Sequence, residues 1–371
     1  MFKKKLQNIF KKFFQFLFKI IHGKVVYKNE NLIHKNIIIS VANKSNIKKF
    51  NNELYKVYKI KNARVYNDTV ENVAIINQNQ ILDKISYQQH QGKLCKANES
   101  IILSKGTPRI KKVINSNLCI LCQGASGNEN YFHWLFDIIP KIKILNEIYK
   151  IEEVDFFYLS KLKDWQKDIL NTMGLKNIKI LDSNTYRHVQ AKEIIAVEHP
   201  WYEKGYILDE VNNIPHWIVE WLRELFIPKA ENFDSNEKIF IDRSESKFKH
   251  CQIINDLEVS KYLESKGFTK HKVGKIPFKK QISLFKNAKI IVGAHGAAFA
   301  NLIFCQPRAK IIEIKPKNHP NYVSRKISEI NNLNYKLIET EIVQDDKKIN
   351  GDIYLDINYL EKQLKELENS K

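Results

Sequence analysis

Cysteine is scarce in this chain of 371 residues, and its number is odd. The five cysteines are too few for the dense, even set of a secreted disulfide framework, so a reducing cytoplasm is predicted. Cys119 and Cys122 form a Cys-x-x-Cys pair, but they lie inside an apolar run. No second pair is present to complete a zinc site, and we interpret both as buried strand residues.

Acidic residues are also few compared with basic ones. Aspartate and glutamate number 41 against 61 lysines and arginines, which leaves a formal net charge of +20. Such an excess predicts a polyanionic partner, either nucleic acid, an anionic membrane or a phosphate-bearing substrate. A genome rich in A and T is the alternative explanation for the plentiful lysine and asparagine. The excess is greatest in residues 1–24, which carry seven lysines and no acid.

The chain has no hydrophobic run long enough to cross a bilayer. The longest stretch near the amino terminus, Phe13–Phe18, is interrupted by Gln15, whereas a transmembrane helix needs roughly 20 apolar residues. Residues 1–23 also lack the small-residue cleavage site of a secretory signal. Their apolar side chains recur every three or four positions, opposite most of the lysines, which predicts a basic amphipathic helix on an anionic membrane surface. Docking on the protein's own core or on a partner helix is the alternative.

Downstream, strands alternate with helices, which predicts parallel βαβ units and an α/β fold. A polar stretch over residues 228–237 reads as a linker between two α/β domains. We therefore predict an amphipathic helix (1–23), an N-terminal α/β domain (24–228), a C-terminal α/β domain (236–345) and a tail with a helix (346–371). Ligands are expected at the carboxyl ends of the strands.

The segment 289–304 has the pattern of an anion site. A β-branched strand ends in Gly293-Ala294-His295-Gly296-Ala297 and is followed by apolar residues at helical spacing. Glycines let a ligand approach the backbone, and the first N–H groups of a helix bind anions. His295 is in position to donate to a phosphate. The alternative is a turn that serves packing alone.

A second motif follows a predicted strand at 118–122. His133 and Asp137 are four residues apart and share one helix face. Pro140 cannot donate to the carbonyl of Phe136, so the helix is expected to kink just after Asp137. A carboxylate beside such a kink is well placed for proton transfer. The alternative is an aspartate–histidine pair that satisfies itself under aromatic side chains.

Together these segments resemble glycosyltransferase family 61. The resemblance rests on Tyr-x-His-Trp-x-x-Asp-x-x-Pro at 131–140, Ile-Asp-Arg-Ser at 241–244, and Gly-Ala-His-Gly-Ala at 293–297 with Asn301 downstream. The resemblance covers residues 118–337. Within the family, the chain is similar to the bacterial branch of capsular polysaccharide and lipopolysaccharide biosynthesis. It implies a GT-B-like fold of two Rossmann-like α/β domains facing a cleft. It also implies inverting transfer of a sugar from a nucleotide-sugar donor to a glycan or lipid-linked acceptor in surface polysaccharide biosynthesis.

The resemblance also implies roles for individual residues. Asp137, with His133 as the alternative, is the catalytic base. The resemblance implies donor binding by the following residues: Arg243, Lys249, Gly293, His295, Gly296, Ala297, Asn301 and Glu313. Lys249 stands where the family usually has a second arginine and lacks the bidentate fork. Glu313 is a candidate for the ribose hydroxyls, with a cap or salt bridge as its alternative role.

Two other classes of protein remain as alternatives. The charge also suits a non-catalytic basic protein that binds a membrane or nucleic acid, but no nucleic-acid motif accompanies the lysines. A nicotinamide-dependent enzyme needs Gly-x-Gly-x-x-Gly after a first strand, and this fingerprint is missing. No Asp-x-Asp metal motif is apparent, so we expect transfer without a divalent metal or cofactor. The predicted location is the cytoplasm, peripheral on the inner face of the cell membrane, with no nucleic acid bound.

Overall fold

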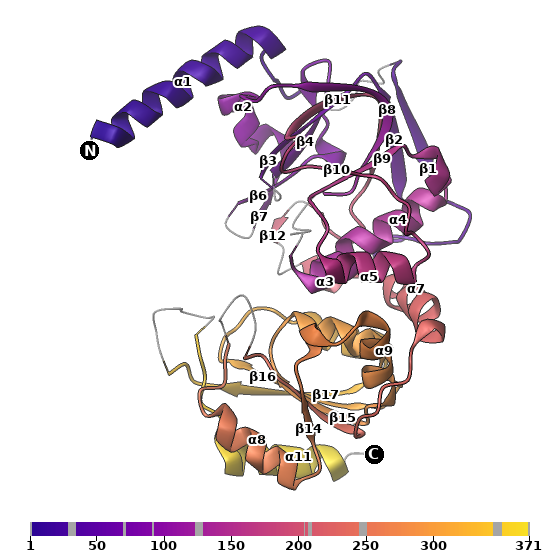
Figure 1. Ribbon diagram of the computed structural model, residues 1–371, viewed down its shortest axis with the longest axis vertical. Coiled ribbons are helices and arrows are strands. Elements are labelled where there is room, and N and C mark those ends of the chain that lie inside the picture. The colour runs from indigo at the N-terminus through magenta and orange to yellow at the C-terminus, as the bar shows by residue number, and fades with distance from the viewer. Residues whose placement is uncertain are drawn as a thin grey trace. The chain divides into compact units, whose positions relative to one another are not determined.

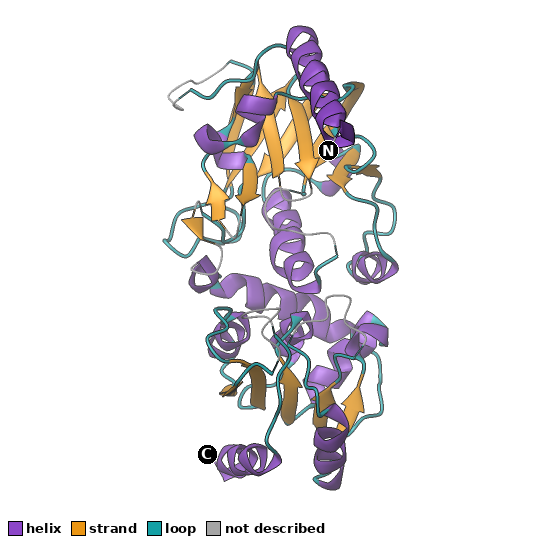
Figure 2. Cartoon of the chain, turned by 90° about the vertical axis from the view of Figure 1, so that its left-hand side faces the viewer, coloured by secondary structure: helices purple, strands orange, loops and turns teal. Residues whose placement is uncertain are grey.

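The computed structural model describes residues 2–28, 35–69, 72–90, 93–122, 129–203, 205–206, 210–244, 251–343 and 351–369. The chain folds into two compact units. The first comprises residues 1–163 and 177–215, and the second comprises residues 164–176 and 216–371. Figures 1 and 2 show the strands and helices of each.

The first unit is built on a mixed sheet of 12 strands. Its parallel part has the order β10-β9-β8-β11, and the strands beyond β11 pair antiparallel. The strands are β1 (Ile37–Val41), β2 (Lys56–Lys61), β3 (Arg64–Thr69), β4 (Asn72–Asn77), β5 (Gln80–Ile81), β6 (Tyr87–His90), β7 (Lys93–Cys95), β8 (Lys112–Ile120), β9 (Phe156–Leu159), β10 (Ile180–Asp182), β11 (His188–Val197) and β12 (Gly205–Tyr206). The helices are α1 (Phe2–His22), α2 (Ile101–Lys105), α3 (Tyr131–His133) and α4 (Ile139–Asn146).

The second unit is a parallel sheet of five strands with the order β14-β13-β15-β16-β17. The strands are β13 (Lys238–Ile241), β14 (Thr269–His271), β15 (Ile290–Ala294), β16 (Lys310–Pro316) and β17 (Asn334–Thr340). The helices are α5 (Asp164–Thr172), α7 (His216–Phe226), α8 (Asp256–Ser265), α9 (Phe278–Asn287), α10 (Val323–Ile330) and α11 (Ile357–Asn369). Helices α8 and α11 lie on one face of the sheet, and α9 lies on the other (Figure 1). The predicted α/β fold with parallel strands is confirmed.

The strand order of the second unit creates a switch point. The connection from β13 leads to β14 on one side, whereas β15 continues to β16 on the other. The carboxyl ends of β13 and β15 therefore open a crevice that is not covered by a crossover, which is where α/β sheets bind ligands.

The boundary between the units differs from the predicted one at residues 228–236. Helix α7 belongs to the second unit because Phe226 packs edge-on against Phe278 and Phe304. Helix α5 also belongs there, since the Asp168 carboxylate accepts the backbone N–H of Phe278 at 2.9 Å and so caps α9. Both assignments depend on contacts between residues that are far apart in the sequence.

The carboxyl-terminal helix is part of the second unit's core rather than a separate tail. Leu360, Leu364 and Leu367 of α11 are buried in the same apolar cluster as Val259 and Leu263 of α8. Their spacing of three and four residues places them on one face of the helix. This face closes one side of the parallel sheet.

Replacing Leu364 with alanine is therefore expected to lower the free energy of unfolding by about 2–5 kcal/mol, because the leucine is 3% exposed and its loss leaves a cavity. Chemical denaturation followed by circular dichroism measures the change. The exposed Lys362 of the same helix is the matched control, and Lys362→Ala should alter stability by less than about 0.5 kcal/mol. Equal midpoints for the two variants would show that α11 does not contribute to the core.

Helix α1 is attached to the first unit by its polar side. The Lys19 ammonium donates to the carbonyl of Ser104 at 2.6 Å, and the His22 ring lies 4.7 Å from that of His188. Leu17 and Phe18 are half-buried, but most apolar side chains of α1 are exposed: Phe16 is 65% exposed and Ile20 is 67% exposed. The alternative that this face docks on the protein's own core is thus not what the structure has. Within the described residues, no helix has the length and apolar character needed to cross a membrane.

Candidate functional site

The helix that carries His133 and Asp137 widens instead of kinking. Residues Trp134–Ile138 form a π-helical segment between α3 and α4. Pro140 has no N–H for the carbonyl of Phe136, and the indole N–H of Trp201 donates to that carbonyl at 3.2 Å. The predicted break at Pro140 thus takes the form of a π-bulge, a feature often found at functional sites.

The Asp137 side chain is completely buried, and both of its oxygens are engaged. Oδ2 lies 2.9 Å from Nδ1 of His133, one turn earlier on the same helix. Oδ1 accepts the indole N–H of Trp201 at 3.1 Å. Burial raises the pKa of this carboxyl, but His133 and then His199 lower it by more, so the pKa lies well below its ordinary value. Asp137 is therefore an ionised acceptor of N–H groups inside the protein.

A second histidine, His199, faces the same carboxylate. Its Nδ1 accepts the backbone N–H groups of Trp201 and Tyr202 at 3.3 and 2.9 Å, so the proton of the neutral ring sits on Nε2. That nitrogen lies 3.6 Å from Oδ2 of Asp137. Burial lowers the pKa of His199 to about 4, although Asp137 opposes the shift. At neutral pH His199 thus presents an N–H dipole to Asp137 without a full charge.

A buried lysine supplies positive charge one turn after Asp137. Lys141 is fully buried, and its ammonium donates to the carbonyl of Leu121 at 3.1 Å. Burial lowers the pKa of Lys141 to about 8, and attraction to Asp137 counteracts part of that shift. Cys119 and Cys122 are buried nearby as free thiols, and burial raises their pKa values. They are not reactive thiolates.

His133 is the member of this cluster that reaches solvent. Its side chain is 20% exposed, whereas that of Asp137 has no exposed surface. When Nδ1 donates its proton to the ionised Asp137, a neutral imidazole ring has its lone pair on Nε2. Of the two residues expected to serve as the base, His133 is therefore the one with exposed side-chain surface. The carboxylate lies behind the histidine.

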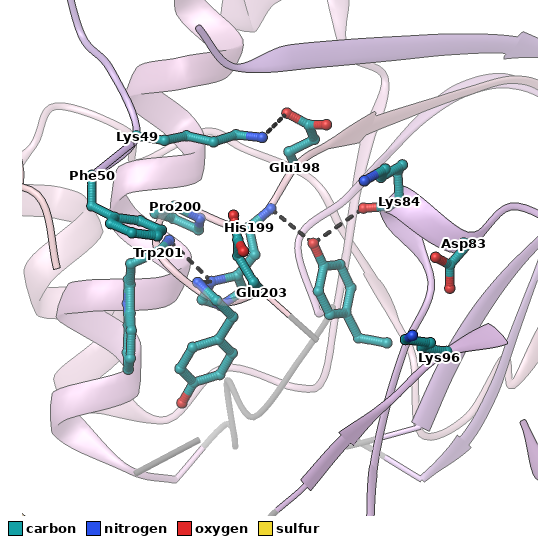
Figure 3. Close-up of a pocket in the computed structure, with 12 residues that line it drawn as sticks. Lys49, Phe50, Asp83, Lys84, Lys96, Glu198, His199, Pro200, Trp201 and Glu203 are labelled. Carbon is teal, nitrogen blue, oxygen red and sulfur yellow. Dashed lines mark hydrogen bonds and ion pairs between the residues drawn. The ribbon is translucent and has the colours of Figure 1, made fainter. Parts of the chain in front are cut away.

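The segment His199–Tyr202 also forms the wall of a cavity of about 300 Å³ in the first unit. Figure 3 shows Trp201 and His199 beside the ion pair of Lys49 and Glu198, which are 2.8 Å apart. Phe50 at the edge of the cavity is 44% exposed. The cavity and the His133–Asp137 pair thus share three side chains, those of His199, Trp201 and Tyr202.

The sequence reasoning missed these three residues. They are more than 60 positions from His133, and no local pattern links the two segments. A signal was nevertheless present, because both segments follow predicted strands. Strands β8 and β11 are parallel neighbours in the sheet, so the segments after their carboxyl ends come together.

In the second unit, His295 lies against a buried carboxylate as His133 does in the first. Its Nδ1 is 2.6 Å from Oε1 of Glu313, and its side chain is 10% exposed. Glu313 is fully buried and also accepts the hydroxyls of Ser324 and Tyr335. The pKa of Glu313 is raised by burial and lowered further than that by His295 and the two hydroxyls. Glu313 thus has the ion-pair role that the sequence analysis gave as its alternative to binding ribose hydroxyls.

Arg243 and Gly296 are in direct contact. A Cβ atom on Gly296 would lie 2.6 Å from Nη1 of Arg243, so any larger residue there would require the guanidinium to shift. Gly296 itself begins the 3₁₀-helical segment Ala297–Phe304, where an α-helix was predicted. Burial lowers the pKa of Arg243, and attraction to Cys251 and Glu313 acts in the opposite direction. Arg243, His295, Gly296 and Ala297 thus form one cluster at the carboxyl ends of β13 and β15.

The remaining predicted donor residues lie elsewhere. A Cβ on Gly293 would approach Cβ of Ile241 to 2.9 Å, so this glycine serves close packing of β15 on β13. Asn301 is fully buried, and its amide donates to Oε1 of Gln281 at 3.1 Å. In the structure Asn301 thus joins the 3₁₀ segment to α9. Lys249 lies outside the described residues.

A cavity of about 380 Å³ opens beside the Arg243 cluster, at the switch point of the sheet. Ile241, Arg243 and Ala294 line it at the strand ends, together with Asp352. Its size suits a small-molecule ligand, for which pockets of roughly 300–1,000 Å³ are usual. Among the residues that the structure describes, no three histidine, cysteine or carboxylate side chains gather as ligands for a metal.

Comparison with known families bears on both clusters. Residues 131–312 match the family model Glycosyltransferase 61. The match supports a glycosyltransferase of family 61. It extends over just under half of the chain and includes His133, Asp137, Arg243 and His295. No curated protein matches the chain. A glycosyltransferase binds a nucleotide-sugar donor and an acceptor, which are the ligands that the two clusters have to account for.

Proposed function

We propose that the chain is an inverting glycosyltransferase that acts in surface polysaccharide biosynthesis. It moves a sugar from a nucleotide-sugar donor to a glycan or lipid-linked acceptor, and its two units work as the halves of a GT-B-like enzyme of the bacterial branch. The observation that carries the proposal is the pair of histidine–carboxylate clusters, one in each unit. His133, Asp137 and His295 lie within the segment that matches family 61, and Glu313 directly follows it.

His133 is proposed as the catalytic base, with Asp137 as a positioning residue. The acceptor hydroxyl attacks the anomeric carbon, the bond from that carbon to the diphosphate breaks, and the hydroxyl proton passes to Nε2 of His133. The buried carboxylate of Asp137 holds the ring in the required tautomer and stabilises the imidazolium that forms. The exposure of His133 and the complete burial of Asp137 support this division of roles.

Arg243 and His295 are proposed to bind the diphosphate of the donor. The guanidinium and the N–H groups at the start of the 3₁₀ segment stabilise the negative charge that develops as the diphosphate leaves. Glu313 orients His295 in the way that Asp137 orients His133. The charge stabilisation comes from fixed protein groups, so we propose transfer without a divalent metal.

A donor screen tests the proposed activity. Purified protein is incubated with UDP-, GDP-, CMP- and dTDP-sugars, and release of the nucleotide is measured. Slow hydrolysis of one donor class, faster on addition of a lipid-linked or soluble glycan acceptor, is the expected result. The absence of hydrolysis and of binding for every nucleotide would favour a non-catalytic basic protein.

We further propose that α1 holds the enzyme on the inner, cytoplasmic face of the cell membrane, where a lipid-linked acceptor lies. An exposed apolar face on a helix that carries six lysines suits an anionic bilayer. The side that binds the first unit is the polar one, so the apolar side is left for the lipid.

Replacing Phe13, Phe16 and Ile20 with serine is expected to weaken binding to anionic vesicles by at least about 100-fold, because three exposed apolar side chains no longer enter the bilayer. Vesicle co-sedimentation measures this, and added salt should weaken binding of the unmodified chain. The control is Ile38→Ser with Ile39→Ser on β1, which removes similarly exposed apolar side chains away from α1. Equal binding by the α1 variant and the unmodified chain would refute the membrane role.

A further inference from the structure

Two strongly exposed apolar side chains of the first unit lie outside α1, on the segment that leads into β8. Ile110 is 85% exposed and Val113 is 66% exposed, which is comparable to Phe16 and Ile20 on α1. Val113 belongs to the amino end of β8, where every second residue is exposed. Large apolar side chains that are exposed close together indicate a surface that contacts another molecule or a membrane.

The charge of this segment is entirely positive. Residues 101–120 contain four basic residues and no acid. The Lys111 ammonium donates to Oε1 of Gln190 at 2.6 Å, and the Lys112 ammonium lies 3.7 Å from the ring centroid of Tyr186. Among the residues that the structure describes, neither ammonium is paired with a carboxylate. Apolar side chains among uncompensated lysines suit an anionic bilayer better than nucleic acid, which is bound mainly through its phosphates.

The same segment is joined to the carboxyl end of α1. Nε2 of His22 donates to the carbonyl of Arg109 at 3.1 Å. The buried guanidinium of Arg64 connects the two segments a second time, because it donates to the carbonyl of His22 at 3.3 Å and to Oγ1 of Thr107 at 3.1 Å. The last turn of α1 and the segment that carries Ile110 are therefore held at fixed positions relative to each other.

We propose that residues 109–113 form a second membrane contact beside α1, in which Ile110 and Val113 enter an anionic bilayer and the neighbouring lysines face its phosphates. The inference rests on the proposed membrane role of α1 and adds that the body of the first unit also touches the lipid. A single helix leaves the enzyme free to rotate about the helix axis, whereas two joined contacts fix which side faces the bilayer. The second contact lies at the amino end of β8, and the segment of His133 comes after its carboxyl end.

A fluorescent label at position 110 of the full chain tests this contact. Ile110→Cys can be labelled selectively with a polarity-sensitive maleimide, because the five native cysteines are buried. On vesicles that contain phosphatidylglycerol, the emission should shift to shorter wavelength and be quenched by brominated lipid. Ile38→Cys on β1 is the matched control, since Ile38 is also exposed but lies beside the opposite end of β11. The label at position 38 should not be quenched.

Removal of the two apolar side chains provides a second measurement. Ile110→Ser with Val113→Ser should weaken binding of the full chain to the same vesicles about 10-fold, because two side chains no longer enter the bilayer. The melting temperature should change little, since both positions are exposed. Unchanged vesicle binding by this variant would overturn the inference.

The outcomes separate the second contact from the membrane role of α1. Vesicle binding by the full chain with no quenching at position 110 would overturn the second contact and leave the role of α1 intact. No binding of the full chain to anionic vesicles would overturn both. Equal quenching at positions 38 and 110 would show contact without a preferred side, which also contradicts the inference. Shielding of the label by a short RNA but not by vesicles would assign the surface to nucleic acid instead.

Discussion

Replacing His133 with alanine is expected to lower kcat by about 10²–10⁴-fold while donor affinity and melting temperature change little. The reason is geometric: His133 is the exposed end of the pair, and its Nε2 carries the lone pair when Nδ1 donates to Asp137. Steady-state transfer assays with saturating donor measure the change. Added imidazole should restore part of the turnover, since it supplies the missing base at the space left by the side chain.

Asp137→Asn should also lower kcat, but for a different reason and without rescue by imidazole. The amide cannot hold His133 in the same tautomer or stabilise its protonated form. The control is Tyr202→Phe, which removes a hydroxyl 3.5 Å from Nδ1 of His133 and should have a small effect. If Asp137→Asn is inactive while His133→Ala transfers sugar at a near-normal rate, the carboxylate takes the proton and the proposed roles are reversed. Full activity in both variants would show that the helix of His133 and Asp137 has only a structural role.

Loss of the Arg243 guanidinium is expected to reduce turnover by about 10²–10³-fold, as is typical when one donor to developing charge is removed. Arg243→Ala leaves the fold intact because the residue follows β13 and lines a cavity. Transfer and donor-hydrolysis assays measure the effect. The exposed Arg325, which pairs with Glu329 on α10, provides the control, and Arg325→Ala should retain activity.

Gly296→Ala tests the same contact without removing the charge. The added methyl group would lie 2.6 Å from Nη1 of Arg243, so the guanidinium has to move and the donor is held less well. We expect a loss of turnover in the same direction as in Arg243→Ala. Near-normal turnover in Arg243→Ala with an unchanged melting temperature would remove this arginine from the site.

The burial of Asp137 and that of Glu313 share a physical cause. Sequence reasoning placed Asp137 and Glu313 in direct contact with substrate, and in the structure each is fully buried behind a histidine. Their residue types and local spacing do not reveal this. Burial depends on partners far along the chain, such as Trp201 for Asp137 and Tyr335 for Glu313.

The sequence by itself determined the features that depend on near neighbours. The periodicity of α1, the shared face of His133 and Asp137, the disruption caused by Pro140, and the strand-and-turn pattern at 289–297 all follow from interactions over a few residues. Each of these is found in the structure at or near the expected place, although the break at Pro140 takes the form of a π-helical segment and the turn leads into a 3₁₀ helix.

Only the tertiary structure decided which of these groups reach solvent and which unit each helix joins. Parallel pairing of β8 with β11 brings His199 and Trp201 to Asp137, and the capping of α9 by Asp168 draws α5 into the second unit. The cavity that contains Asp352 likewise forms from segments about 100 residues apart, because the backbone near Gln252 hydrogen-bonds to the segment of Asp352. Such contacts depend on how the sheets assemble, and the energy that selects them is shared among residues that no local window contains.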